Sequence, residues 1–177
     1  NTSKTATNTV SDAMTTQAIA GNAGLYDFDG GFKIKSVKDA AGKAMPHFIN
    51  QTMMRVDLAQ PLKTGQKISF SIDWSFNIND RVREASPNDG RSGMEYFPKD
   101  GNHLYIIAQW FPRMCVYDDL IGWQNKQFLG QGEFTLSFGN YQVNLTVPAD
   151  HIVAGTGMVQ NLKEVLTGEQ YNRFEQA

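Results

Sequence analysis

Residues 67–80, KISFSIDWSFNIND, carry the clearest structural pattern in this chain. Apolar side chains occupy every second position from Ile68 to Ile78, and polar side chains fill the positions between them. Successive side chains of a strand point to opposite faces, so this alternation predicts a β-strand with one buried and one solvated face. Because strands solvated on one face are typical of antiparallel sheets, the stretch predicts an antiparallel β-structure.

Shorter β-patterns lie on both sides of this stretch. Residues 32–37, FKIKSV, alternate at Phe32 and Ile34, lose the register at Ser36 and resume it at Val37. Further strands are predicted over residues 53–58, 105–110, 134–138, 141–147 and 152–157, with Gly139-Asn140 as a hairpin turn. About seven or eight strands with little helix predict an all-β fold, an antiparallel β-sandwich with a short C-terminal helix or linker.

Turns and loops separate these segments. Residues 39–43, DAAGK, predict a turn in which Gly42 can adopt positive φ, and residues 61–66, PLKTGQ, predict another. Residues 79–103 are rich in Gly, Pro, Asn, Asp and Arg and predict a long loop. Such loops inside compact domains are often functional, although an exposed excursion without a function is an equal alternative.

The two ends of the chain differ from its middle. Residues 1–23 are small and polar, which is compatible with a weak helix or with disorder. We therefore expect the β-sandwich domain over residues 24–160. Residues 161–177 predict a helical linker in which Asn161 and Glu164 have the spacing of a capping box and Gly168 breaks the helix.

Length and charge limit the classes of function. A chain of 177 residues is expected to form one domain, which needs no disulfide or metal to hold its core. A net charge of −2 disfavours nucleic acid or an anionic membrane as a partner. No apolar run approaches the roughly 20 residues of a membrane span. Because the chain begins without Met, we interpret it as a mature or trimmed piece.

Few residues suggest catalysis in this chain. His47, His103 and His151 are scattered, and neither H-E-x-x-H nor C-x-x-C occurs, so we expect no metal site. The single cysteine, Cys115, lies in the apolar run RMCVY and is expected to be structural rather than nucleophilic.

Adjacent aspartates follow this cysteine. Asp118 and Asp119 point to opposite faces of an extended chain and cannot act as a pair, but one of them is expected to cap a turn before Gly122-Trp123. Pro112 is expected to end the strand over residues 105–110, with Met114, Cys115 and Val116 in the core.

Aromatic residues leave a second class of function open. Trp74 shares its face with Ile and Phe side chains, which indicates a core position. Trp110 and Trp123 have no such pattern, and exposed Trp side chains are what a sugar-binding surface requires. A free-standing β-sandwich module that binds sugar or peptide is therefore the alternative hypothesis.

Four segments together resemble a known family. They are residues 61–78, PLKTGQKISFSIDWSFNI; 108–123, AQWFPRMCVYDDLIGW; 129–157, LGQGEFTLSFGNYQVNLTVPADHIVAGTG; and 164–177, EVLTGEQYNRFEQA. Over about residues 53–177 the chain resembles the amino-terminal β-domain of aminopeptidase N-type zinc metallopeptidases, the gluzincins, in particular the divergent branch of Bacteroidetes-type bacteria. The family's characteristic positions correspond to Gln109, Arg113, Asp118 and Val147-Pro148.

The resemblance implies a saddle-shaped β-domain that packs on a catalytic domain of the same protein. That catalytic domain, absent from these residues, would carry H-E-x-x-H and a further Glu to bind Zn²⁺ and would cleave peptides. No catalytic residue and no cofactor is expected within residues 1–177. The compartment that we expect is the periplasm, the cell envelope or the exterior of the cell.

Individual residues take their expected roles from the same resemblance. Gln109 would face the substrate. The family usually has a Glu two places later that holds the substrate's amino end, but this chain has Phe111 there, so the anchor is missing or moved. Trp110, Phe111 and Trp123 would form an exposed apolar surface against the catalytic domain.

Overall fold

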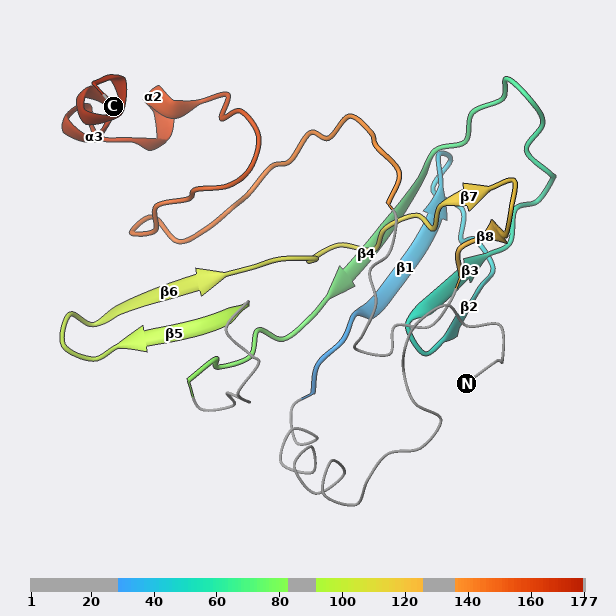
Figure 1. The fold of residues 1–177 in the computed structure, drawn as a ribbon, viewed down its shortest axis with the longest axis horizontal. Helices are drawn as coiled ribbons and strands as arrows, with labels where there is room; N and C mark the ends of the chain where they lie inside the picture. The colour runs from blue at the N-terminus through green and yellow to red at the C-terminus, as the bar shows by residue number, and fades with distance from the viewer. Residues whose placement is uncertain (1–28, 83–91, 126–135, 177) are drawn as a thin grey trace, which may run out of the picture. The chain divides into compact units, whose positions relative to one another are not determined.

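The computed structural model of the chain describes residues 29–82, 92–125 and 136–176 (Figure 1). These residues belong to two compact units, one ending at Phe138 and one beginning at Gly139. The strands are β1 (Lys33–Asp39), β2 (His47–Asn50), β3 (Met53–Val56), β4 (Phe70–Ser75), β5 (Gly93–Phe97), β6 (Asn102–Ile106), β7 (Tyr117–Asp118) and β8 (Gly122–Trp123). The helices are α2 (Leu162–Val165) and α3 (Gly168–Glu175).

The predicted all-β class is confirmed. The strands of the described ranges form four antiparallel pairs, β1–β4, β2–β3, β5–β6 and β7–β8, and only two short helices accompany them. The stacking of these sheets into a sandwich remains a prediction. The helix or disorder predicted for residues 1–23 lies outside the described residues.

The β1–β4 pair shows why the sequence loses its alternation at Ser36. Ile34 lies opposite Trp74 and Val37 opposite Ile72, and the register shifts between Ile34 and Ser36. Such a β-bulge inserts one extra residue in one strand, so two apolar residues three positions apart face the same side. The side chain of Val37 is only 2% exposed, the lowest among the apolar residues described.

The strand predicted over residues 67–80 is shorter in the structure. β4 begins at Phe70 and ends at Ser75, because its partner β1 offers only seven residues for pairing. The apolar face of β4 is half-buried at Ile72 and Trp74 rather than buried as expected. Within the described ranges, the buried apolar side chains are Val37 and Met45. A two-stranded sheet has too little surface of its own to bury a face without a further layer.

The turn predicted at residues 39–43 is confirmed. The carboxylate of Asp39 accepts hydrogen bonds from the backbone N–H groups of Ala41 and Lys43, both at 2.9 Å. Gly42 adopts φ 80°, a conformation that costs glycine nothing sterically. The turn places Met45 beside Val37, the one buried residue of β1: the Met45 N–H donates to the carbonyl of Val37 at 2.9 Å.

The loop predicted over residues 79–103 is partly wrong, because β5 and the start of β6 lie within it. The strand signal of β5 was hidden by flanking Gly, Pro and Asp residues. Gly93 begins β5 at φ 132°, and a Cβ there would lie 2.8 Å from the carbonyl oxygen of Asn79. The Met94 N–H donates to that same carbonyl at 2.7 Å, so only glycine permits this close backbone approach.

Four other predicted strands differ from the structure. The strand predicted over residues 105–110 is shifted, since β6 covers Asn102–Ile106. Residues 136–138, 141–147 and 152–157 contain no strand, and residues 134–135 lie outside the described ranges. Alternation alone sets which side chains share a face, whereas a strand also needs a hydrogen-bonded neighbour.

The unit that begins at Gly139 contains the predicted helical end. Asn161 precedes α2 but its side chain makes no capping hydrogen bond to the backbone. The predicted break of the helix occurs just before Gly168, at Leu166 and Thr167; Gly168 itself begins α3 and Thr167 caps it. Thr167 and Gln170 exchange the two hydrogen bonds of a capping box.

We predict that Val37→Ala lowers the free energy of unfolding by about 1–3 kcal/mol, because it removes buried methyl groups. Val82→Ala is the matched control, since Val82 is 64% exposed and the same change there should cost less than about 0.5 kcal/mol. Urea unfolding followed by tryptophan fluorescence measures both. Equal losses in the two variants would contradict the assignment of Val37 to the core.

Candidate functional site

The predicted site residues lie on the segment that follows β6. Gln109 is exposed and adopts φ 52°, a left-handed conformation that is uncommon for residues other than glycine. This conformation turns the chain so that the next residue, Trp110, contacts β4. Backbone strain of this kind costs on the order of 1 kcal/mol, and the packing of Trp110 offsets it.

Trp110 packs against Trp74 of β4. The two indole rings are stacked with centroids 6.4 Å apart and an interplanar angle of 27°. The Nε1–H of Trp74 donates a hydrogen bond to the backbone carbonyl of Trp110 at 3.1 Å. This contact joins residues 36 positions apart in the sequence and fixes the chain after β6 against the β1–β4 sheet.

Phe111 continues the same aromatic contact. Its ring meets that of Trp110 edge-to-face at 5.0 Å, and the guanidinium of Arg113 lies 6.0 Å from the centroid of the Phe111 ring. Trp110 and Phe111 are therefore half-buried. The Phe111 ring supplies no carboxylate at the position where the resemblance would place a Glu.

Trp123 lies apart from this contact, on the β7–β8 hairpin. It is 54% exposed, and its ring meets that of Tyr117 edge-to-face at 5.3 Å. The two residues are directly opposite each other in the register of the hairpin. The expected interdomain residues thus fall into two groups: Trp110 with Phe111, and Trp123 with Tyr117.

Asp118 caps the turn of this hairpin, as expected for one member of the aspartate pair. Its carboxylate accepts from the N–H groups of Ile121 at 2.7 Å and Leu120 at 3.0 Å, and from the side-chain amide of Gln124. These hydrogen bonds, the one from Ile121 foremost, lower the pKa of Asp118 because they favour the charged carboxylate. The carboxylate therefore has a structural role in the turn.

Cys115 contacts a second sulfur atom. Its thiol donates to the thioether of Met53 in β3 at 3.8 Å, and the side chain is half-buried. A small polarizable side chain packed on methionine fits the structural role expected of this cysteine. The neighbouring Met114 is 60% exposed, so its expected core position is wrong.

The three histidines are in separate places. His47 contacts the carbonyl of Met45, and His151 pairs with Asp150. Within the ranges that the structure describes, no three His, Cys, Asp or Glu side chains gather closely enough to ligate a metal ion.

His103 belongs to an aromatic row that the sequence pattern did not reveal. On one face of the β5–β6 hairpin its ring lies 4.7 Å from that of Tyr96 and 6.3 Å from that of Tyr105. Tyr96 and His103 are opposite each other in the register. The sequence places His103 and Tyr105 two residues apart, which predicts that they share one face of a strand. It does not reveal that Tyr96 joins them, because that depends on the pairing of β6 with β5.

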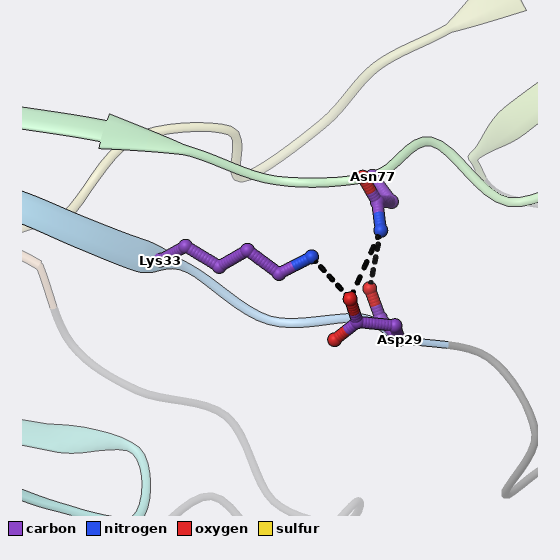
Figure 2. Close-up of polar contacts among 3 residues, drawn as sticks. All are labelled: Asp29, Lys33 and Asn77. Atoms are coloured by element: carbon purple, nitrogen blue, oxygen red, sulfur yellow. Dashed lines mark hydrogen bonds and ion pairs between the residues drawn. The ribbon is translucent and has the colours of Figure 1, made fainter.

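Three polar residues, Asp29, Lys33 and Asn77, contact one another where the chain enters β1 (Figure 2). The side-chain amide of Asn77 donates to the backbone carbonyl of Asp29 at 2.8 Å, and Lys33 forms an ion pair with the Asp29 carboxylate. Both charged side chains are exposed to solvent, so their ion pair contributes at most about 1 kcal/mol.

A shallow hollow of about 320 Å³ lies in the first unit, and none of the predicted site residues lines it. It is lined by Leu58, Gln60, Pro61, Leu62, Gln66, Lys67 and Ile68. The side chain of Gln66 already accepts a hydrogen bond from the Lys63 N–H at 2.8 Å, which closes the turn predicted at 61–66. The hollow is thus a feature of that turn.

Comparison with known proteins leaves the family open. The chain matches no family model, no curated protein and no solved structure. None of the helices in the described ranges is long and apolar enough to cross a bilayer.

We predict that Trp74→Phe lowers the free energy of unfolding by about 1–2 kcal/mol, because it leaves the Trp110 carbonyl without its donor. Trp123→Phe is the matched control: it makes the same change at an exposed ring and should cost about 0.5 kcal/mol or less. Urea unfolding followed by circular dichroism compares the two. A larger loss in the control would refute the importance of the Trp74–Trp110 contact.

Asp118 gives a pH-dependent prediction. Its lowered pKa in the folded state means that the carboxylate stabilises the fold above the ordinary aspartate value of about 3.9, and that this stability is lost as the pH falls through the lowered value. Asp118→Asn should therefore be less stable than the parent chain at pH 6, and the difference should disappear in strong acid.

Urea midpoints between pH 2 and pH 7 measure this effect. Asp119→Asn is the control, because it removes one charge from the same segment without removing an acceptor of the turn hydrogen bonds. A stability difference for Asp118→Asn that stayed constant across the whole pH range would contradict the capping role of the carboxylate.

Proposed function

We propose that this chain is the non-catalytic amino-terminal β-domain of a zinc-dependent aminopeptidase, which packs on the catalytic domain and shapes its cleft. The observation that carries the proposal is the large amount of exposed apolar side chain. Every hairpin of the described ranges exposes large apolar residues, whereas Val37 and Met45 are the buried ones. Exposed apolar side chains of this kind are compatible with packing against a further part of the polypeptide.

The sequence resemblance over residues 53–177 indicates which neighbour covers this surface. Its characteristic positions Gln109, Arg113 and Asp118 lie within ten residues of one another, after β6 and in β7. Trp110 and Phe111 connect this segment to β4 through ring contacts. These contacts fix the segment on β4, as would be required of a segment that lines a cleft.

Gln109 is the residue that we assign to the substrate side of this wall. Its side chain is exposed, and the left-handed backbone at this position turns the chain there. An amide can hydrogen-bond the backbone of an extended peptide with both its donor and its acceptor. The amino end of the substrate would be held by a residue other than Phe111.

The catalytic chemistry would belong to the partner domain. There a Zn²⁺ ion would activate water for attack on the peptide bond. The residues of this chain would exclude water and position the peptide. We place the protein in the periplasm, in the cell envelope or outside the cell.

The test uses the complete natural polypeptide and the 177-residue chain side by side. The gene should encode H-E-x-x-H and a further Glu after Ala177, and the complete polypeptide should release aminoacyl-anilide products until a chelator removes its metal. The 177-residue chain should give no turnover and bind no Zn²⁺ in equilibrium dialysis. Turnover by the short chain, or an inert complete polypeptide without that motif, would refute the proposal.

A free-standing module for sugar or peptide is the second candidate. The observation in its favour is the exposed Tyr117–Trp123 pair, since exposed aromatic rings can stack on sugar rings. Selective binding on a glycan array that is lost in Trp123→Ala, but retained in the control Trp74→Phe, would support this candidate over the first. Cys115→Ala included in the activity assay would reveal any turnover that depends on the thiol.

A further inference from the structure

Two triplets of the chain have the form Asn-X-Thr, the acceptor motif for N-linked glycans: Asn50-Gln51-Thr52 and Asn144-Leu145-Thr146. Triplets of this form also occur by chance, so the motif alone does not make a site. A glycan is bulky and needs an acceptor at the surface, in a segment that a modifying enzyme can reach. The positions of the two triplets in the structure therefore distinguish between them.

The first triplet lies at the turn of the β2–β3 hairpin (Figure 1). Asn50 pairs with Met53, so Gln51 and Thr52 form the two-residue turn between the strands. All three residues of the triplet are exposed, and Gln51 adopts φ 53°. Because the chain reverses directly after Asn50, this side chain lies at the end of the hairpin, where an enzyme can reach it.

Phe48 supplies a second, independent observation at the same place. It precedes Asn50 by two residues in β2, so the two side chains project from one face of the hairpin, about 7 Å apart along the strand. Phe48 is 61% exposed, and Arg55, the residue opposite it in β3, is also exposed. An aromatic ring open to solvent thus lies beside the acceptor nitrogen of the triplet.

We propose that Asn50 carries an N-linked glycan whose first sugar packs on the ring of Phe48. The C–H groups on one side of a sugar ring are apolar, and they stack on an aromatic face. The glycan therefore covers a ring that the two strands of the hairpin leave exposed.

The donor is an oligosaccharide joined through a pyrophosphate to a membrane lipid. Nδ2 of Asn50 forms a bond to C1 of the first sugar as the bond between C1 and the pyrophosphate oxygen breaks. The lipid pyrophosphate leaves with the electron pair of that bond, and one Nδ2 proton passes to a base of the transferase. This step requires the exported location proposed above, but it is independent of the aminopeptidase activity.

Asn144 is an internal control for the geometry. It belongs to the same kind of triplet and is exposed, so the motif and its accessibility are matched. It differs in two respects: residues 141–147 form neither a strand nor a turn, and Gln142 rather than an aromatic residue lies two places before it. We therefore expect Asn144 to carry several-fold less glycan than Asn50.

Mass spectrometry of the complete natural polypeptide, isolated from the cells that produce it, tests the site. The expected result is a glycan on the peptide that contains Asn50, absent in Asn50→Gln, with peptide N-glycosidase converting the modified asparagine to aspartate. An unmodified Asn50 would overturn the inference. Occupancy at Asn144 equal to or above that at Asn50 would overturn it as well, because the motif alone would then explain the modification.

Fractionation of the same cells separates this failure from that of the proposed location. Exported protein with an unmodified Asn50 refutes the glycan alone. Cytoplasmic protein with an unmodified Asn50 refutes both the glycan and the location. Aminopeptidase turnover of the isolated protein is scored separately, since neither result depends on it.

Thermal unfolding of the same polypeptide tests the contact between the sugar and Phe48. Enzymatic removal of the glycan should lower the unfolding midpoint of the parent, and should lower that of Phe48→Ala by less than half as much. Phe174→Ala is the matched control, because Phe174 is 55% exposed on α3 and belongs to no acceptor triplet, so it should retain the full shift. Equal shifts in the parent and in Phe48→Ala would refute the packing of the sugar on this ring.

Discussion

Ile34 and Val37 face the apolar side of β4 together only because β1 holds one extra residue between them. The bulge brings Val37 opposite Ile72, where it becomes the most buried apolar residue described, and leaves Ile34 opposite Trp74. Without the bulge, Val37 would point to the solvated face of the sheet, since a shift of one residue exchanges the faces. The contacts of Trp74 then depend on this register.

Trp74 connects the β1–β4 sheet to the segment that contains the candidate site. Its ring stacks on Trp110, and its Nε1–H holds the carbonyl of Trp110, so the segment after β6 has a fixed place on β4. Gln109 precedes this contact in a left-handed conformation, and Phe111 and Arg113 follow it. A residue on a loop has a better defined position when its neighbour in the chain packs on a sheet, and Trp110 provides such a neighbour for Gln109.

Exposed apolar side chains are the other dominant feature, and they connect the fold to the proposed function. The two-stranded sheets of the first unit bury few side chains. In the β7–β8 hairpin of the same unit, the Asp118 carboxylate and Gly122 fix a turn whose apolar side chains are exposed. Asp118 and Asp119 resemble a catalytic pair in the sequence, but they have different environments in the structure. Asp118 accepts the hydrogen bonds of the turn, whereas Asp119 is exposed to solvent.

The sequence by itself determined the local features of this chain: the β class, the turn at 39–43, the break at Ser36 and the turn-capping aspartate, since alternation, glycine and short-range hydrogen bonds act between neighbouring residues. Only the tertiary structure decided that β4 stops at Ser75, that Phe111 stacks on Trp110 and that Tyr96, His103 and Tyr105 form a row. It also decided that Tyr117 and Trp123 are exposed, whereas Trp110 is half-buried. Each of these depends on which strand becomes the neighbour of another, and a pattern with a period of two residues carries no information about that partner.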